Sequence, residues 1–150
     1  MRIAVTNVLS SQPIPMGNTQ ASGYRISFKS DTVAGQAIFV PADTLADQFL
    51  EQQYYVETDY EGIENFRIWT RPDPPTLTIR PLTQPGDYEL VAVVEAVTLL
   101  TDDINRVVVD VVAGDIAFTL TVTKLDSAVP SVGDVITCTV RALSLWDEAL

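Results

Sequence analysis

The stretch Ile116-Ala117-Phe118-Thr119-Leu120-Thr121-Val122-Thr123 decides the fold class of this chain. Apolar side chains alternate with small or polar ones along it, and a period of two predicts a strand with one buried face. Residues 106–112 form a similar run just before it, and Ala113-Gly114 joins the two. A glycine in so short a connection can supply the positive φ of a tight hairpin. We therefore expect two antiparallel strands here.

β-Branched residues dominate the rest of the chain. Val, Ile and Thr make up 45 of the 150 residues, and these types favour pleated, half-buried strands. Residues 91–100 are apolar on nearly both faces, which predicts a strand covered on two sides. Residues 135–145 predict a strand or a bent pair of strands, in which Cys138 shares a face with Ile136 and Val140. We therefore expect Cys138 to be a small core residue.

One segment, residues 43–52, has helical spacing. Asp43 is placed to cap a first turn that follows Pro41. The apolar side chains fall on one stripe at intervals of three and four residues, and they are Leu45, Ala46, Phe49 and Leu50. We expect one short helix here, covering an end or a face of a sheet.

A proline-rich connector divides the chain. Five of the nine prolines lie in residues 70–87, and proline predicts a stiff extended connection because it fixes φ and lacks an N–H. Short matches on the two sides, such as Ile3-Ala4-Val5 with Val91-Ala92-Val93, indicate a degenerate repeat. The expected domains are a first β-barrel with one helix over 1–70, the connector over 71–87, and a second β-barrel over 88–150.

The sequence pattern of each half predicts three strands, then a helix or turn, and then two more strands. This order resembles the five-stranded OB-like barrel. The expected fold is therefore all-β with one short helix, built as two tandem OB-like five-stranded barrels packed together. A half of this size buries so little surface that it is marginally stable alone, and no disulfide can support it. We expect the halves to share a core or to bury surface against other subunits.

The second half also resembles the TOBE-type small β-barrel, mainly over residues 88–147. The resemblance rests on two long strands within 107–122, a short turn, and the entry Val132-Gly133-Asp134-Val135 to the next strand. It implies a tandem-barrel protein that binds molybdate or tungstate. The first half departs from the family, because Val5-Thr6-Asn7-Val8-Leu9 stands where that family has Ser-Ala-Arg-Asn. No ligand residues are therefore carried over.

The chain lacks the residues on which most catalytic and metal sites depend. It contains no His and one Cys, which excludes Ser-His and Cys-His nucleophile pairs, an internal disulfide and a structural zinc site. The acidic residues between 51 and 64 do not follow the spacing of a calcium loop. We expect a protein that is not an enzyme and that uses no cofactor and no metal.

Twenty acidic and nine basic residues give a net charge of −11. This charge repels nucleic acid and acidic membranes at long range, and it suits a positively charged partner. The N-terminus lacks the apolar block of a secretory signal, and no run approaches the length of a membrane helix. The expected partner is a protein or a second copy of the chain rather than a membrane. The expected localisation is cytoplasmic or virion-associated.

These observations favour a non-enzymatic β-barrel assembly or interaction protein, such as an accessory structural protein of a phage or virion. One alternative is an OB-like single-stranded nucleic-acid-binding protein, because such a sheet face can stack bases on aromatic rings. A second alternative is a tandem-barrel binder of an oxyanion or another small ligand. The residues expected to form a binding surface are Tyr54, Tyr60, Arg67, Trp69, Arg71 and Trp146.

Overall fold

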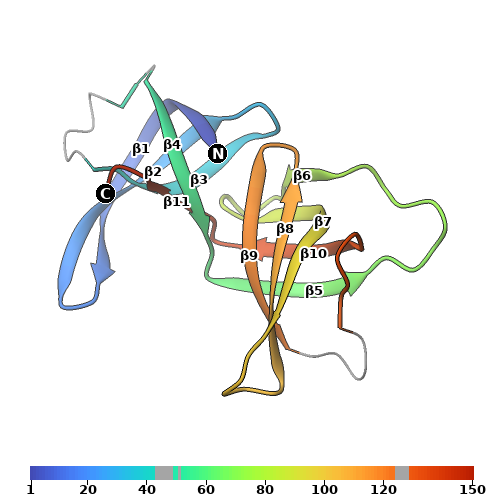
Figure 1. Cartoon of the computed structure of the whole chain (residues 1–150). Coiled ribbons are helices and arrows are strands. Elements are labelled where there is room, and N and C mark those ends of the chain that lie inside the picture. Colours follow the sequence, from blue (N-terminus) through green and yellow to red (C-terminus); the bar gives the residue numbers. More distant parts are fainter. Residues whose placement is uncertain (43–48, 51, 124–128) are drawn as a thin grey trace.

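The computed structural model describes residues 1–42, 49–50, 52–123 and 129–150. These residues form eleven strands and no helix, which confirms the predicted all-β class (Figure 1). In chain order the strands are β1 (Arg2–Met16), β2 (Thr19–Lys29), β3 (Ala34–Val40), β4 (Gln53–Asp59), β5 (Gly62–Ile68), β6 (Thr78–Pro81), β7 (Tyr88–Leu99), β8 (Arg106–Ala113), β9 (Ile116–Thr123), β10 (Val135–Arg141) and β11 (Ser144–Asp147).

The predicted helix over residues 43–52 falls mostly outside the described residues. Two of its apolar positions are described. Phe49 is fully buried in the core, and Leu50 forms an isolated parallel bridge with Val5. The segment therefore delivers at least one of its apolar side chains to the interior.

The strands form two packed, barrel-like sheets, as predicted. The first is a closed five-stranded barrel in the order β1-β2-β3-β11-β4, and β4 pairs with β1 to close it. The second is a curled, open sheet in the order β5-β10-β7-β8-β9, to which β6 adds by pairing with β7. The closed barrel is compatible with the expected OB-like architecture.

The two sheets share one strand order and exchange one strand. Read from β11, the barrel runs β11-β4-β1-β2-β3, and the second sheet runs β5-β10-β7-β8-β9. Thus β11, from the end of the chain, completes the first sheet, and β5 completes the second. The pairing therefore crosses the expected division into 1–70 and 88–150.

The predicted hairpin is confirmed as β8 and β9. Their register pairs Ala113 with Ile116 around Gly114, whose φ is 63°. A side chain at Gly114 would also collide with Thr32, which bonds to the Asp115 carboxylate. This turn needs glycine both for its backbone conformation and for its contact with the loop that precedes β3.

One continuous hydrophobic core extends through both sheets. It takes Phe28 and Phe39 from the barrel, Leu120 and Ile136 from the second sheet, and Leu145 from β11. Cys138 is buried in this core, as predicted. The single core agrees with the expectation that the two halves share a core.

The run at residues 91–100 is covered on two sides only in its first part. Val91, Ala92 and Val94 are buried, whereas Leu99 is 60% exposed. The end of β7 pairs with β8 as a projecting ribbon, which explains the exposure (Figure 1). Among the described residues, no helix has the length and apolar character needed to cross a membrane.

Candidate interaction surfaces

The second sheet is open where the barrel is closed. In the barrel, β3 pairs with β11 in parallel to complete the ring. The corresponding strands of the second sheet are β9 and β5, which stand at the two ends of its strand order. We call the opening between β5 and β9 the seam. It is lined by one face of each edge strand, and edge strands are the usual place where further strands add to a sheet.

Tyr60 fastens one end of the seam. It lies at the corner between β4 and β5, and its hydroxyl donates to the carbonyl oxygen of Thr119 at 3.2 Å. The same hydroxyl accepts the backbone N–H of Thr121 at 3.0 Å. Burial raises the pKa of this hydroxyl. Tyr60 thus satisfies the edge of β9 in place of a paired strand.

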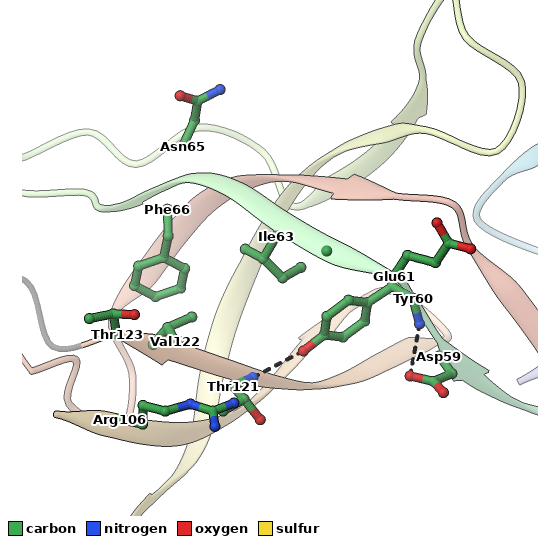
Figure 2. Close-up of a pocket in the computed structure, with 11 residues that line it drawn as sticks. Asp59, Tyr60, Glu61, Ile63, Asn65, Phe66, Arg106, Thr121, Val122 and Thr123 are labelled. Atoms are coloured by element: carbon green, nitrogen blue, oxygen red, sulfur yellow. Dashed lines mark hydrogen bonds between the residues drawn. The ribbon is translucent and has the colours of Figure 1, made fainter. Parts of the chain in front are cut away.

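Side chains from β5 fill the next part of the seam. Ile63 and Phe66 point toward β9, and Asn65 points away (Figure 2). Asn65 has a φ of 55°, and the β5–β10 register shifts opposite it. This bulge lets both apolar side chains face the same gap, because it breaks the alternation of the strand. The remaining pocket has a volume of about 630 Å³.

The seam carries charges of both signs. Asp59 and Glu61 line one wall, and Arg106 lines the other. Arg106 lies 4.0 Å from the carboxylate of Asp103 and is half exposed. The described residues contain no group of three or more acidic or Cys side chains arranged to hold a metal ion. The seam therefore offers apolar contact and strand edges rather than a charged ligand set.

A partly buried ion pair joins β10 to the start of β7 and to β5 beside the seam. Arg141, at the end of β10, donates to the Asp87 carboxylate at 2.6 Å and to the Glu64 carboxylate at 2.8 Å. Asp87 also accepts the backbone N–H of Ala142 at 3.0 Å. Burial alone would raise the pKa of Asp87, but these hydrogen bonds and the guanidinium hold it below its usual value. We call Asp87, Glu64 and Arg141 the clamp. It lies where the chain leaves β10 and enters the barrel.

Tyr54 is partly buried and packs against the hydrophobic core. Its ring points into the barrel, where its centroid lies 5.0 Å from that of Phe39 and 6.2 Å from that of Phe49. Its neighbour Tyr55 is 62% exposed. Successive side chains of a strand face opposite ways, so one of the two had to be inside.

Arg67, Trp69 and Arg71 form a separate group at the end of β5. The guanidinium of Arg71 stacks over the Trp69 ring, 5.7 Å from its centroid. The Trp69 indole N–H donates to the Asp73 carbonyl oxygen at 3.2 Å. Arg67 is exposed on β5 and pairs in register with Thr137. The structure thus brings three of the six predicted residues to one neighbourhood, and Tyr60 lies at the corner before β5.

Trp146 lies apart from them, on the outside of the barrel. It belongs to β11, and its cross-strand neighbour on β4 is Glu57. Together with Met16 and Leu150 it lines a hollow of about 520 Å³. We call this hollow the Trp146 groove. The six predicted residues therefore divide among the barrel interior, the β5 strand with its corner and following loop, and this groove.

A hairpin arm projects from the barrel. The chain between Arg2 and Arg25 contains no charged residue, and β1 and β2 pair along this stretch to the turn at Met16↔Thr19. The β1–β2 register shifts at Thr6 and at Leu9, and such bulges bend a strand. We call residues 7–23 the arm. Figure 1 shows it extending past the other barrel strands.

Sequence reasoning missed the clamp and the seam. The partners of Arg141 are 54 and 77 residues away in sequence, so no local pattern could identify them. The arm is different, because its lack of charged residues is visible in the sequence. That signal could have identified the arm as a candidate surface. The chain matches no protein-family model, no curated protein and no solved structure.

Proposed function

We propose that this chain is a non-enzymatic component of a protein assembly and that its arm contacts a neighbouring copy. Accessory structural proteins of virions are one class of such components. The observation that carries the proposal is the arm, an uncharged hairpin on a chain whose net charge is −11.

Charge explains why the arm is the contact. Two copies with the same large negative charge repel each other over most of their surface. The cores of protein interfaces are depleted of charged residues. The arm lies within the longest run of the sequence that has no charged residue, so a second copy can approach it without bringing like charges together. Its exposed apolar side chains include Leu9 and Met16, which are 44% and 39% exposed.

The backbone of the arm supports the same role. Among the described residues, β1 pairs with β4 only at Arg2 to Ala4, and β2 pairs with β3 only from Tyr24 onward. The outer edges of the arm are therefore available to another strand. Pro13 and Pro15 lack N–H donors, which limits indiscriminate strand addition along β1.

Light scattering on a shortened arm tests the proposal. Gln12 pairs with Gly23, so replacing residues 13–22 by Asn-Gly gives a compact hairpin with a favourable turn. The wild-type mass should rise above that of the monomer as concentration increases, and the shortened variant should stay monomeric. A wild-type protein that stays monomeric throughout, or a shortened variant that associates equally, would contradict the proposal.

A charged variant provides a matched control. Gln12→Glu with Gln20→Glu places like charges on the arm and should weaken association by electrostatic repulsion. Gln84→Glu with Thr101→Glu adds the same two charges at exposed positions outside the arm and should leave the association nearly unchanged. An equal effect of both changes would indicate net charge rather than an arm contact.

Single-strand nucleic-acid binding remains the second candidate. The Arg71–Trp69 stack beside Arg67 supports it, because aromatic and guanidinium planes stack on bases. The net charge of −11 opposes it. A gel shift at low salt should show no binding by wild type, and binding that Trp69→Ala abolishes would favour this candidate. The oxyanion alternative rests on the TOBE-type resemblance of residues 88–147 and stays a prediction.

A further inference from the structure

We infer that the Trp146 groove binds a basic, extended segment of a different protein, anchored by an apolar side chain. The groove shares only Met16 with the arm and takes the rest of its lining from β4, β11 and the residues after β11, and the inference does not depend on contact between copies.

The floor of the groove is apolar and open. Met16 comes from the arm, Trp146 from β11 and Leu150 from the turn that follows β11. Leu150 is 57% exposed, and Trp146 is only partly covered by its own chain. Three apolar side chains thus form a surface from which an inserted apolar side chain can displace water.

The shape of the groove is held by hydrogen bonds. The Trp146 indole N–H donates to the Ser144 hydroxyl at 3.0 Å. The buried carboxylate of Asp147 accepts the backbone N–H of Ala149 at 3.0 Å and that of Ala42 at 3.2 Å. These contacts fix the turn that carries Leu150. A ligand therefore meets a preformed surface and pays less to order it.

Negative charge surrounds the apolar floor. Glu57, Asp59 and Glu148 line the groove, and its described lining contains no Lys or Arg. Glu57 and Glu148 also line an adjoining cleft of about 560 Å³ along β4, where Glu95 and Asp110 add two more carboxylates. The N-terminal ammonium of Met1 also lines that cleft, but it donates to the Val56 carbonyl oxygen at 3.0 Å.

Charge complementarity identifies the occupant. An apolar side chain fits the floor, and Lys or Arg side chains on both sides of it fit the carboxylates. A second copy of this chain is a poor occupant, because it too carries a charge of −11. A basic protein segment is attracted at long range, and this attraction weakens as salt is added.

Fluorescence of the full-length protein tests this inference. The chain has two tryptophans, so Trp69→Phe leaves Trp146 as the only indole reporter. The probe is a short, glycine-spaced peptide with arginines on both sides of a central leucine. We expect a saturable blue shift of the Trp146 emission that weakens with salt. A matched peptide with glutamates in place of the arginines should cause none.

Two double variants test whether the peptide binds in the groove. In the Trp69→Phe background, Glu57→Gln with Glu148→Gln should weaken binding about fivefold or more, because two rim charges are removed. Glu61→Gln with Asp31→Asn removes the same charge from exposed positions outside the groove and should leave the affinity nearly unchanged. Equal weakening by the two pairs would overturn the inference, since the attraction would then come from net charge.

The apolar anchor has its own test. A peptide with serine in place of the leucine should bind more weakly, and spermine should compete poorly with the leucine peptide. Equal binding of the leucine and serine peptides, strong displacement by spermine, or no saturable shift would each overturn the inference. The oligomeric state measured for the arm variants is a separate readout, so failure of one proposal leaves the other standing.

Discussion

Tyr88 donates its phenolic hydrogen to the carbonyl oxygen of Gln36 at 2.6 Å. The two residues belong to different sheets, since Tyr88 begins β7 and Gln36 lies on β3 of the barrel. Tyr88 is fully buried, and burial raises the pKa of its hydroxyl. Gly35 lets the ring approach, because a side chain there would collide with the Tyr88 hydroxyl. This contact joins the two sheets inside the shared core.

Removing that hydroxyl should destabilise the whole protein. Tyr88→Phe leaves the carbonyl of the partly buried Gln36 without this donor, which costs about 1–3 kcal/mol. Urea denaturation should show a lower midpoint and still a single transition, because the core is continuous. Tyr55→Phe is the control, since Tyr55 is 62% exposed. A Tyr88→Phe protein as stable as wild type would contradict the role of this bond.

The Asp87–Arg141 ion pair of the clamp should make the free energy of unfolding depend on pH in the acid range. The pKa of Asp87 in the folded protein lies below its ordinary value of 3.8. A depressed pKa contributes stability above the ordinary value, and that stability is lost as pH falls through the folded pKa. Asp87→Asn should therefore be less stable than wild type at neutral pH by about 1–3 kcal/mol. The difference should shrink below pH 3.8, as measured by urea denaturation across pH.

The matched control for the clamp is an exposed ion pair. Glu89 and Arg80 lie 2.7 Å apart, but both side chains are about half exposed or more. Such pairs contribute little to stability. Glu89→Gln should therefore change the acid profile much less than Asp87→Asn. Similar profiles for the two variants would mean that the clamp contributes no more than a surface pair.

Cys138 should be inert in the folded protein. It is buried in the core, and burial raises the pKa of its thiol to about 12. Thiol reagents attack the thiolate, which is both scarce and covered here. We expect no labelling by an aromatic disulfide reagent at mildly alkaline pH, and one equivalent after unfolding in urea. Rapid labelling of the native protein would show that β10 opens readily.

Tyr60 should protect the edge of β9. Its hydroxyl accepts the N–H of Thr121, so Tyr60→Phe exposes that amide to solvent exchange. Hydrogen exchange should become faster at Thr121, whereas Leu120, which is fully buried, should be little affected. Tyr55→Phe should change neither amide. If exchange at Thr121 does not change in Tyr60→Phe, the seam is closed by other groups.

Local patterns predicted the strands better than their partners. The alternation of residues 116–123 became β9, and Gly114 formed its turn. The same alternation says nothing of which strand lies alongside, because it records only burial on one face. That β11 pairs with β3 and β4 depends on contacts more than eighty residues apart. This is why the exchange of fifth strands could not be read from the chain.

The candidate surfaces show the same limit of local sequence patterns, which do not predict contacts between distant residues. Trp146 and Tyr60 were predicted as surface residues, and each lines a hollow. Tyr54 was predicted with them, but its ring packs against the barrel core, since the period of two does not say which of two adjacent tyrosines faces inward. Met16 of the arm joins Trp146 of β11 in one groove, and no sequence spacing encodes that meeting.

The exchanged strands make a final prediction about the two halves. A fragment of residues 1–70 contains β1 to β4 but lacks β11, so the edges of β3 and β4 that β11 covers are bare. A fragment of residues 71–150 lacks β5 and leaves β10 with one neighbour fewer. Each fragment should therefore lack the near-ultraviolet circular dichroism of a packed core, and an equimolar mixture should recover it. The decisive measurement is the unfolding of fragment 1–70 on its own. Cooperative unfolding of this fragment would mean that four strands suffice for the barrel. Leu145 of β11, although fully buried, would then be dispensable to the barrel core.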